Sequence, residues 1–436
     1  MAYYKSFTTE ALELSQTLPE EDSELYKRHF VPIPLEKFAE KLAKAKPENE
    51  DSVQAEISFA LLKNFAAKFD AIIGSTTHVV TSRDKPVRIV NFEDLSEEHL
   101  LNKLYNSKDH RLVAFLHAHS NRVVFINVPD GQKVDINMLF INTDTPLTTQ
   151  VLVSLGREAK LNLFEWYASR TGVGERSLLG VLHEATVGPY ARADINMVHN
   201  EDERTYVINF AKGKVHESGD LRVNSVYNGG LCSRAKTDIA TVGYAANTNL
   251  IELVLGSGEQ KFDLNTTISN VAQNTTAGLE SKAALMDAAS CILKGFANVG
   301  EEARGARSFV NERGILLDKT AYIGSIPGMS INNANVKATH SAATAPVEED
   351  LLFYLMSRGT DKMTATRLLV AGFLAGSLAK MDNPLIKQVV SSLISEKIAT
   401  RRFGDVPKLD VSSIWAEHNA AQADLFEGHY KYRELK

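Results

Sequence analysis

The spacing of apolar positions divides the chain into a helical beginning, a long strand-rich middle and a helical end. In residues 51–69, large apolar side chains recur four residues apart, which predicts an amphipathic helix. These side chains are Val53, Ile57, Leu61, Phe65 and Phe69. A shorter amphipathic stretch covers residues 35–45. We therefore expect residues 1–70 to form an N-terminal helical unit.

From residue 71 to residue 345, short runs of β-branched and aliphatic residues predict strands. These runs cover residues 72–73, 78–80, 87–90, 112–116, 123–128, 138–141, 151–155, 161–166, 206–210, 250–255, 261–264, 292–293 and 315–317. One helix is predicted over residues 94–105. The later runs are separated by Asn, Thr, Ser, Gly and Asp rather than by helices, which argues against a sheet built from strand–helix–strand crossovers.

A sandwich, a barrel and a β-solenoid remain as possible architectures for this middle part. The stretch NTNLIELVLGSGEQKFDLNTTISNVAQNTTAG suits stacked coils, because small polar residues can turn the corners and form ladders along the axis. No fixed repeat length is evident. On this basis we favour a solenoid over a sandwich.

Helical patterns return after residue 345. Thr344 is expected to cap a helix whose first turn carries Glu348, Glu349 and Asp350 at its positive end. Gly359 suits the left-handed position that ends such a helix.

A second helix is predicted from Asp361, as its cap, to Lys380, and Asn383-Pro384 should stop it. A further apolar stripe follows at Ile386, Val389, Val390, Leu393 and Ile394. Residues 346–436 are therefore expected to form a C-terminal helical unit.

Composition and charge exclude some classes of function. The 436 residues are 44% hydrophobic and 23% charged, as in soluble globular proteins. The formal net charge of −6 argues against a nucleic-acid-binding protein. No apolar run approaches the roughly 20 residues that cross a bilayer, and the first residues lack the apolar core of a signal peptide. We expect a cytoplasmic protein that binds neither nucleic acid nor membrane.

Cys232 and Cys291 are the only cysteines. Two distant thiols without a CxxC pair do not supply the four ligands of an ordinary cluster or structural zinc site. We expect both to be small buried residues.

Other candidate chemistry is weak. His117 and His119 lie two residues apart on a predicted strand, so both rings would share one face, but no third ligand is evident. The glycine-rich segments 172–177 and 256–261 lack the spacing and lysine of a phosphate loop and are predicted to be turns. His183-Glu184 and His199 have no evident nucleophile or orienting partner.

One segment carries a family resemblance. DKTAYIGSIPGMSINNANVKATHSAATAPVEEDLLFYLMSRGT is similar to the SufB/SufD family of the SUF iron–sulfur cluster assembly system. The matching positions are Pro327, Val336, Lys337, His340, Ala342, Glu349, Leu352, Phe353, Tyr354, Leu355, Ser357, Arg358 and Gly359, followed by Val370, Gly372 and Phe373. Upstream, residues 180–320 resemble the family only in the general character of their sequence.

The resemblance implies a right-handed parallel β-helix between N- and C-terminal helical units, which agrees with the order of predicted elements. It also implies a non-catalytic component of a cluster-building complex. In that complex a SufC-like ABC-type ATPase docks on the C-terminal helical unit, and a SufB-like paralogue pairs with the β-helix.

The family has two branches, and the resemblance favours SufD. SufB-type members carry a cluster-related Cys at the position of Glu312 and a Glu at the position of Ser341. SufD-type members keep the His alone, usually within VKCSHGAT, where this chain has VKATHSAA. The resemblance therefore implies that His340 lends an iron–sulfur ligand at the partner interface, with no cluster held stably by this chain alone.

The resemblance also places partner contacts in the C-terminal helices. Helices over residues 348–356 and 361–380 would present the SufC-binding surface, a region that includes Phe353, Tyr354, Arg358, Gly359 and Phe373. Within it, Leu352, Phe353 and Phe373 are expected to be packing residues rather than partner contacts, and Arg358-Gly359 to form the turn. A homodimer through the surface meant for SufB is expected when the chain is isolated.

Two alternatives stay open. In the first, the chain is a SufB-like scaffold that acts as a homodimer; the absence of a Cys at position 312 argues against this. Alternatively, the β-helix belongs to a polysaccharide-active enzyme, although the acidic residues Asp135, Asp194 and Asp263 show no grouping in the sequence.

Overall fold

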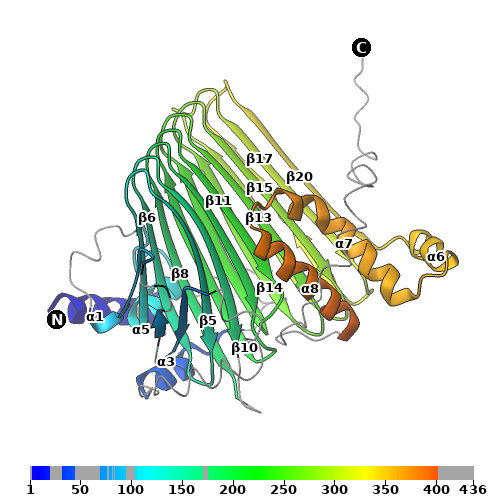
Figure 1. Cartoon of the computed structure of the whole chain (residues 1–436), viewed down its shortest axis with the longest axis horizontal. Coiled ribbons are helices and arrows are strands. Elements are labelled where there is room, and N and C mark those ends of the chain that lie inside the picture. Colours follow the sequence, from blue (N-terminus) through cyan, green and yellow to red (C-terminus); the bar gives the residue numbers. More distant parts are fainter. Residues whose placement is uncertain are drawn as a thin grey trace.

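A computed structural model describes residues 2–19, 32–44, 69–75, 78–80, 82, 84–94, 104–169 and 175–400. It shows a parallel β-solenoid with helices at both ends, as predicted (Figure 1). The predicted helices over residues 51–69 and 94–105 lie largely outside the described residues, as does the first half of the glycine-rich segment 172–177. Within the described residues, no helix is long and apolar enough to cross a membrane.

Two long sheets form opposite walls of the solenoid, and successive strands alternate between them. The first, here called sheet A, contains β2 (His78–Val80), β1 (Ala71–Gly74), β5 (Lys133–Asn142), β7 (Lys160–Ser169), β9 (Arg192–Asn200), β11 (Asp220–Tyr227), β13 (Asn247–Gly256), β15 (Thr276–Leu285), β17 (Arg307–Leu316) and β20 (Lys337–Pro346). The second, sheet B, contains β18 (Tyr322–Ser325), β16 (Ser290–Val299), β14 (Lys261–Asn270), β12 (Cys232–Thr241), β10 (Thr205–Val215), β8 (Ser177–Val187), β6 (Leu147–Leu155), β4 (Arg122–Val128) and β3 (Val87–Asn91), with β19 (Gly328–Ile331) also paired to β16.

The strand register explains why no fixed repeat length appears in the sequence. Lys133 pairs with Lys160, and Lys160 with Arg192, so these two coils differ in length by several residues. The next step pairs Arg192 with Asp220. The strands keep their register while the corner loops absorb the difference, which hides the period from a sequence comparison.

Corners on one edge of the solenoid share a tight geometry. One residue in each turn has positive φ, for example Glu158 at 58°, Tyr190 at 60° and Ser218 at 50°. The backbone N–H of each of these residues donates to a carbonyl of the next corner, as from Tyr190 to Glu217 at 2.8 Å. Stacked corners therefore satisfy backbone groups that a single turn would leave open.

Alternation along the strands separates an apolar interior from two outer faces, each partly covered by helices. The interior is filled by aliphatic side chains of both sheets. On the outer face of sheet A lie α7 (Lys362–Lys380) and α8 (Pro384–Thr400), which bury Phe164 and Trp166. On the outer face of sheet B lie α3 (Leu35–Ala43) and α5 (Arg111–His119), with α1 (Ala2–Thr17) beside α5.

The strand predicted over residues 112–116 is wrong, because this segment is helix α5. The run is buried on all sides between α1 and sheet B, and such a run has no periodicity that distinguishes helix from strand. His110 caps the helix by accepting from the backbone N–H of Leu112 at 3.0 Å. His117 and His119 consequently point in different directions and do not share a face.

The C-terminal helices follow the predicted boundaries more closely. Asp361 caps α7 by accepting from the N–H of Thr364 at 3.0 Å. Pro384 begins α8, and Asn383 accepts from the N–H of Leu385 at 2.8 Å. Thr344, in contrast, lies inside β20, and α6 (Glu349–Ser357) has Glu348 at its N-cap without a side-chain bond. The division of the chain at residues 70 and 345 stays a prediction.

Candidate functional site

The solenoid ends in an exposed strand, β20, that carries His340. β20 pairs in parallel with β17, and no described strand pairs with its other side. His340 is exposed and lies opposite Val310, which belongs to the apolar interior. His340 is therefore on the face of β20 that continues the interior wall at the open end. A strand with an unpaired side is a template for pairing with another chain.

Helix α6 presents apolar side chains to solvent. None of its residues is buried, and Phe353 is 72% exposed. Phe353 is thus not the packing residue that the sequence suggested. The guanidinium of Arg358 lies 5.1 Å from the ring centre of Tyr354, and Gly359 ends the helix with a φ of 92°. An exposed apolar helix of this kind is a candidate protein-binding surface.

Phe373, from the same predicted region, faces the other way. It packs against the cluster between α7, α8 and sheet A. Lys282 Nζ donates to the Phe373 carbonyl at 2.9 Å and lies 5.2 Å from its ring centre. Ser377 and Lys380 both donate to Glu280 of β15 at 2.6 Å. Phe373 therefore helps to hold α7 on the solenoid, as expected of a packing residue.

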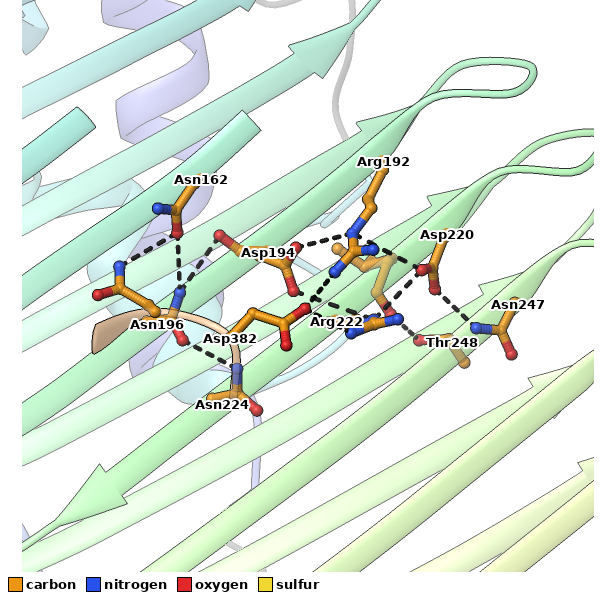
Figure 2. A network of polar contacts seen from close by, with 12 residues as sticks. Asn162, Arg192, Asp194, Asn196, Asp220, Arg222, Asn224, Asn247, Thr248 and Asp382 are labelled. Carbon is orange, nitrogen blue, oxygen red and sulfur yellow. Dashed lines mark hydrogen bonds and ion pairs between the residues drawn. The ribbon is translucent and has the colours of Figure 1, made fainter. Parts of the chain in front are cut away.

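A polar network on the outer face of sheet A fixes the turn between α7 and α8 (Figure 2). Arg192 and Arg222, on neighbouring strands, donate to the same oxygen of Asp382 at 2.6 and 2.9 Å. Arg192 also donates to Asp194, and Arg222 to Asp220. Because Asp382 is largely exposed, these pairs contribute little free energy. They place the turn over β9 and β11.

An asparagine row continues this network across the sheet. Asn224 donates to Asn196 at 2.9 Å, and Asn196 to the Leu163 carbonyl at 3.2 Å (Figure 2). Asn383, which follows Asp382, donates to Asn162 at 3.1 Å. The row therefore gives the turn a second set of contacts.

A buried lysine anchors the C-terminal end of α8. Lys397 is 1% exposed. Its ammonium donates to the carbonyls of Asn228 and Leu255 and to Gln260 Oε1, the last at 2.7 Å. Burial holds the pKa of Lys397 well below its usual range. All three donors of this side chain have acceptors on the solenoid.

Replacing Lys397 with alanine should lower the free energy of unfolding by about 2–4 kcal/mol, since three buried acceptors lose their donor and a cavity remains. Urea midpoints would measure the change. The matched control is Lys362→Ala at the exposed start of α7, for which we expect no more than about 0.5 kcal/mol. Equal midpoints for the two variants would contradict the anchoring role.

Inside the solenoid, an acid, a phenol and an imidazole form a buried chain. The Tyr167 hydroxyl donates to Glu165 Oε2 at 3.0 Å and lies 3.1 Å from His183 Nε2. All three side chains are almost completely buried. Burial raises the pKa of Glu165 to about 8, which the bond from Tyr167 partly offsets. Burial, with His199 acting in the same direction, lowers the pKa of His183 to about 3.

Aromatic rings stack along the interior beside this chain. Phe140, Tyr167, His199 and Tyr227 occupy matching positions on β5, β7, β9 and β11. Successive ring centres are 4.6, 4.6 and 5.0 Å apart. Nδ1 of His199 lies 2.8 Å from Glu201 Oε1. One ring per coil thus extends this local polar group along the axis of the solenoid.

Sequence reasoning missed this interior group. It paired His183 with Glu184, but these neighbours face opposite sides of β8: His183 points inward, while Glu184 accepts from the backbone of Leu104 and Tyr105 outside. The available signal was the polar residue at an inward position of a strand, as with Glu165 in LNLFEWYAS. Without the register, the inward positions were not known.

Two more carboxyl groups lie further along the interior. Glu252 accepts from Thr266 and, at 2.7 Å, from Ser281. Glu312, in the last complete coil, is fully buried. Burial raises the pKa of Glu312 to about 8, and backbone N–H groups of Gly295 and Ile326 offset this in part.

The remaining sequence candidates do not assemble into a site. His117 lies 2.9 Å from Ser107 through Nδ1, whereas the ring of His119 lies against Phe115. Asp194 is on the outer face of sheet A, and Asp263 pairs with Lys294 on sheet B at 3.2 Å. No group of three or more His, Cys, Asp or Glu side chains in the described part of the chain is arranged to hold a metal ion.

Both cysteines are buried, as expected. Cys232 packs outside the solenoid, in the cluster with α3 and α5. Cys291 lies in an apolar cluster with Phe262 and Leu293. Burial and nearby carboxylates hold the pKa of the Cys291 thiol well above its usual range, so it is a poor nucleophile. The segment 256–261 is the predicted turn, between β13 and β14.

Comparison with known proteins identifies the family of this chain. The family model for the SUF system FeS cluster assembly SufBD core domain matches residues 139–373. The chain is 25% identical to the iron–sulfur cluster assembly protein SufD of Bacillus subtilis, over 70% of this chain and 71% of that protein. It is 24% identical to a SufBD family protein of Pyrococcus horikoshii, over 73% and 71%. A SufBD family protein of Staphylococcus epidermidis is 27% identical, over 44% and 42%. The chain therefore belongs to the SufBD family of iron–sulfur cluster assembly proteins.

Proposed function

We propose that this chain is a SufD-like, non-catalytic component of an iron–sulfur cluster assembly complex, working with a SufB-like scaffold and a SufC-like ATPase. Similarity to the SufD of Bacillus subtilis supports the SufD role over most of the chain. The observation that carries the proposal is the pair of exposed surfaces at the C-terminal end, β20 with His340 and the apolar helix α6. Each surface suits a different partner.

The strand β20 is the proposed site for the SufB-like chain. Its ten residues are almost all exposed, and they are mostly Ala, Thr and Ser, which allow another backbone to approach closely. A second copy of this chain would occupy the same edge when the protein is isolated. His340 would then face the partner and contribute a ligand to a transient cluster shared by both chains. Imidazole is an occasional replacement for thiolate in such clusters.

Helix α6 is the proposed docking site for the ATPase, and α7 and α8 hold it in place. Replacing both Phe353 and Tyr354 with aspartate should reduce capture of an ABC-type ATPase by tagged protein at least about 100-fold, because two apolar contacts become charged. The double variant should fold normally, since both residues are exposed. The control Tyr244→Asp, at an exposed aromatic side chain in a corner of the solenoid, should capture as the unaltered chain does.

If the unaltered protein captures neither an ABC-type ATPase nor a SufB-like chain from its native host, the proposal is overturned. Anaerobic iron and sulfide analysis tests the ligand role separately. The chain alone should be colourless, and its complex brown, with the colour reduced by His340→Ala. A stable cluster on the isolated chain would instead favour a SufB-like scaffold.

A further inference from the structure

Four polar atoms in the coils formed by β7 to β10 are buried and have no hydrogen-bond partner among the described residues. They are Glu165 Oε1, His183 Nδ1, His199 Nε2 and Asn209 Oδ1. Each belongs to a side chain that is no more than 4% exposed. Leaving a buried polar atom unpaired is costly, so folded proteins satisfy nearly all of them. Four such atoms in neighbouring coils therefore indicate a small polar ligand.

The four side chains belong to one small region of the interior. The Tyr167 hydroxyl lies 3.0 Å from Glu165 Oε2 and 3.1 Å from His183 Nε2. The ring of Tyr167 stacks on that of His199, with ring centres 4.6 Å apart. Asn209 is on the strand next to His183, two residues away in register and on the same inward face. The unpaired atoms are therefore within reach of a shared ligand.

Alanine residues leave room beside this group. The residue paired with His183 on β10 is Ala211, and the residue paired with Asn209 on β12 is Ala235. A methyl group reaches less far into the interior than the imidazole or the amide beside it. A buried water molecule needs such room together with roughly two to four polar partners. The inner wall of sheet B provides both at this place.

The hydrogen-bond pattern shows what the ligand must do. Tyr167 donates its only proton to Glu165, so His183 Nε2 donates to the Tyr167 oxygen and His183 Nδ1 is left as an acceptor. In the same way, His199 Nδ1 donates to Glu201 Oε1 and leaves Nε2 as an acceptor. Glu165 Oε1 is a donor, because burial raises the pKa of this carboxyl group to about 8 and keeps it protonated at neutral pH. The ligand must accept from an acid and donate to imidazoles.

From this arrangement we propose that the coils of β7 to β10 hold buried water in a fixed site formed by these four side chains. Water fits because it is small enough for the room beside two alanines and both accepts and donates. About two molecules supply enough hydrogens for the two imidazole nitrogens and the Asn209 oxygen. A metal ion does not fit, since no group of acidic, His or Cys side chains in the described part of the chain is arranged to hold one.

The water joins the two histidines and the acid into one hydrogen-bonded network across neighbouring coils. The network lies in the interior, away from the surfaces of β20 and α6 to which partners were assigned, so the site does not depend on the proposed function.

The test counts long-lived water molecules in the full-length chain by ¹⁷O magnetic relaxation dispersion. Ala211→Val fills the room without removing a polar atom and should lose about two such molecules. Glu165→Met removes the acid and should lose about one. Methionine suits position 165, because Met138 and Met197 flank it on the neighbouring strands.

The matched control is Ala297→Val, at an inward alanine of β16 that pairs with Ile268 in the apolar interior. This variant should keep the water count of the unaltered chain. Urea unfolding verifies that each variant is folded, and either test variant is sufficient if the other does not fold. A crystal structure of the unaltered chain should show water within hydrogen-bonding distance of His183 Nδ1. Equal water counts in the unaltered chain and the folded test variants, or a crystal structure without water at this place, would overturn the site.

Discussion

Replacing Glu165 with glutamine should stabilise the folded chain, and the gain should grow as pH rises from about 4.5 to 8. The pKa of Glu165 is about 8 in the folded chain, against an ordinary value of 4.5. As pH rises, the unfolded chain therefore loses the Glu165 proton at a lower pH than the folded chain does. The contribution of protonated Glu165 to the free energy of unfolding is fully present below pH 4.5 and is lost as pH rises through 8. The difference corresponds to at most about 5 kcal/mol. Glutamine keeps an acceptor for Tyr167 without a carboxylate to bury.

His183 makes the stability of the unaltered protein depend on pH in the opposite direction. Its pKa falls from 6.5 to about 3 on folding, so its contribution is present above pH 6.5 and lost as pH falls toward 3. Between pH 4.5 and 6.5 the two groups nearly cancel. The sum of these two contributions predicts that stability is highest in that interval and declines above it. Glu312, whose pKa is also about 8, adds to the decline.

Urea unfolding of the unaltered chain and of Glu165→Gln, at intervals from pH 4 to 9, measures this dependence. The control is Glu259→Gln, an exposed carboxyl group in the turn between β13 and β14, which should not alter the pH profile. If the urea midpoints of the Glu165→Gln variant and the unaltered chain differ by a constant amount between pH 5 and 8, Glu165 does not keep its proton in the folded state.

Replacing Gly243 with alanine should destabilise the solenoid by about 3 kcal/mol or more. A Cβ atom at this position would lie 2.0 Å from the backbone nitrogen of Glu217 and 2.3 Å from the carbonyl carbon of His216. These atoms belong to the corner of the preceding coil, which cannot move away without losing backbone hydrogen bonds between corners. Overpacking against backbone is among the larger single-residue effects.

The matched control for Gly243→Ala is Gly376→Ala. Gly376 is exposed on helix α7, and nothing lies within 4 Å of a Cβ atom there. Alanine favours helix over glycine by up to about 1 kcal/mol, so this variant should be neutral or more stable. Thermal and urea unfolding of both variants gives the comparison. Equal stability of the two variants would show that the stacked corners tolerate displacement.

The sequence was sufficient for several features whose determining interactions are local. The cap of α7 at Asp361 depends on a side chain three residues from its partner, and the stop before Asn383-Pro384 depends on the proline itself; the structure has both where they were predicted. Many strand positions followed from short β-branched runs for the same reason, although β8, β9, β11, β12, β15 and β20 were not among the predicted runs. The family followed from residues 327–373, where many spaced positions match one pattern. For these features, neighbours along the chain carry the information.

Tertiary structure decided the features that depend on how the coils stack, which are the strand register and the side-chain contacts between coils. The apolar run at residues 112–116 is a helix because α1 and sheet B enclose it, and residues 27 to 32 apart in sequence are paired by corner loops of unequal length. Only that arrangement places Glu165 Oε2 3.6 Å from His183 Nε2. It also brings Asp382 onto Arg192 and Arg222. A one-residue change of register would turn each of these side chains to the opposite face, so no local pattern in the sequence can specify them.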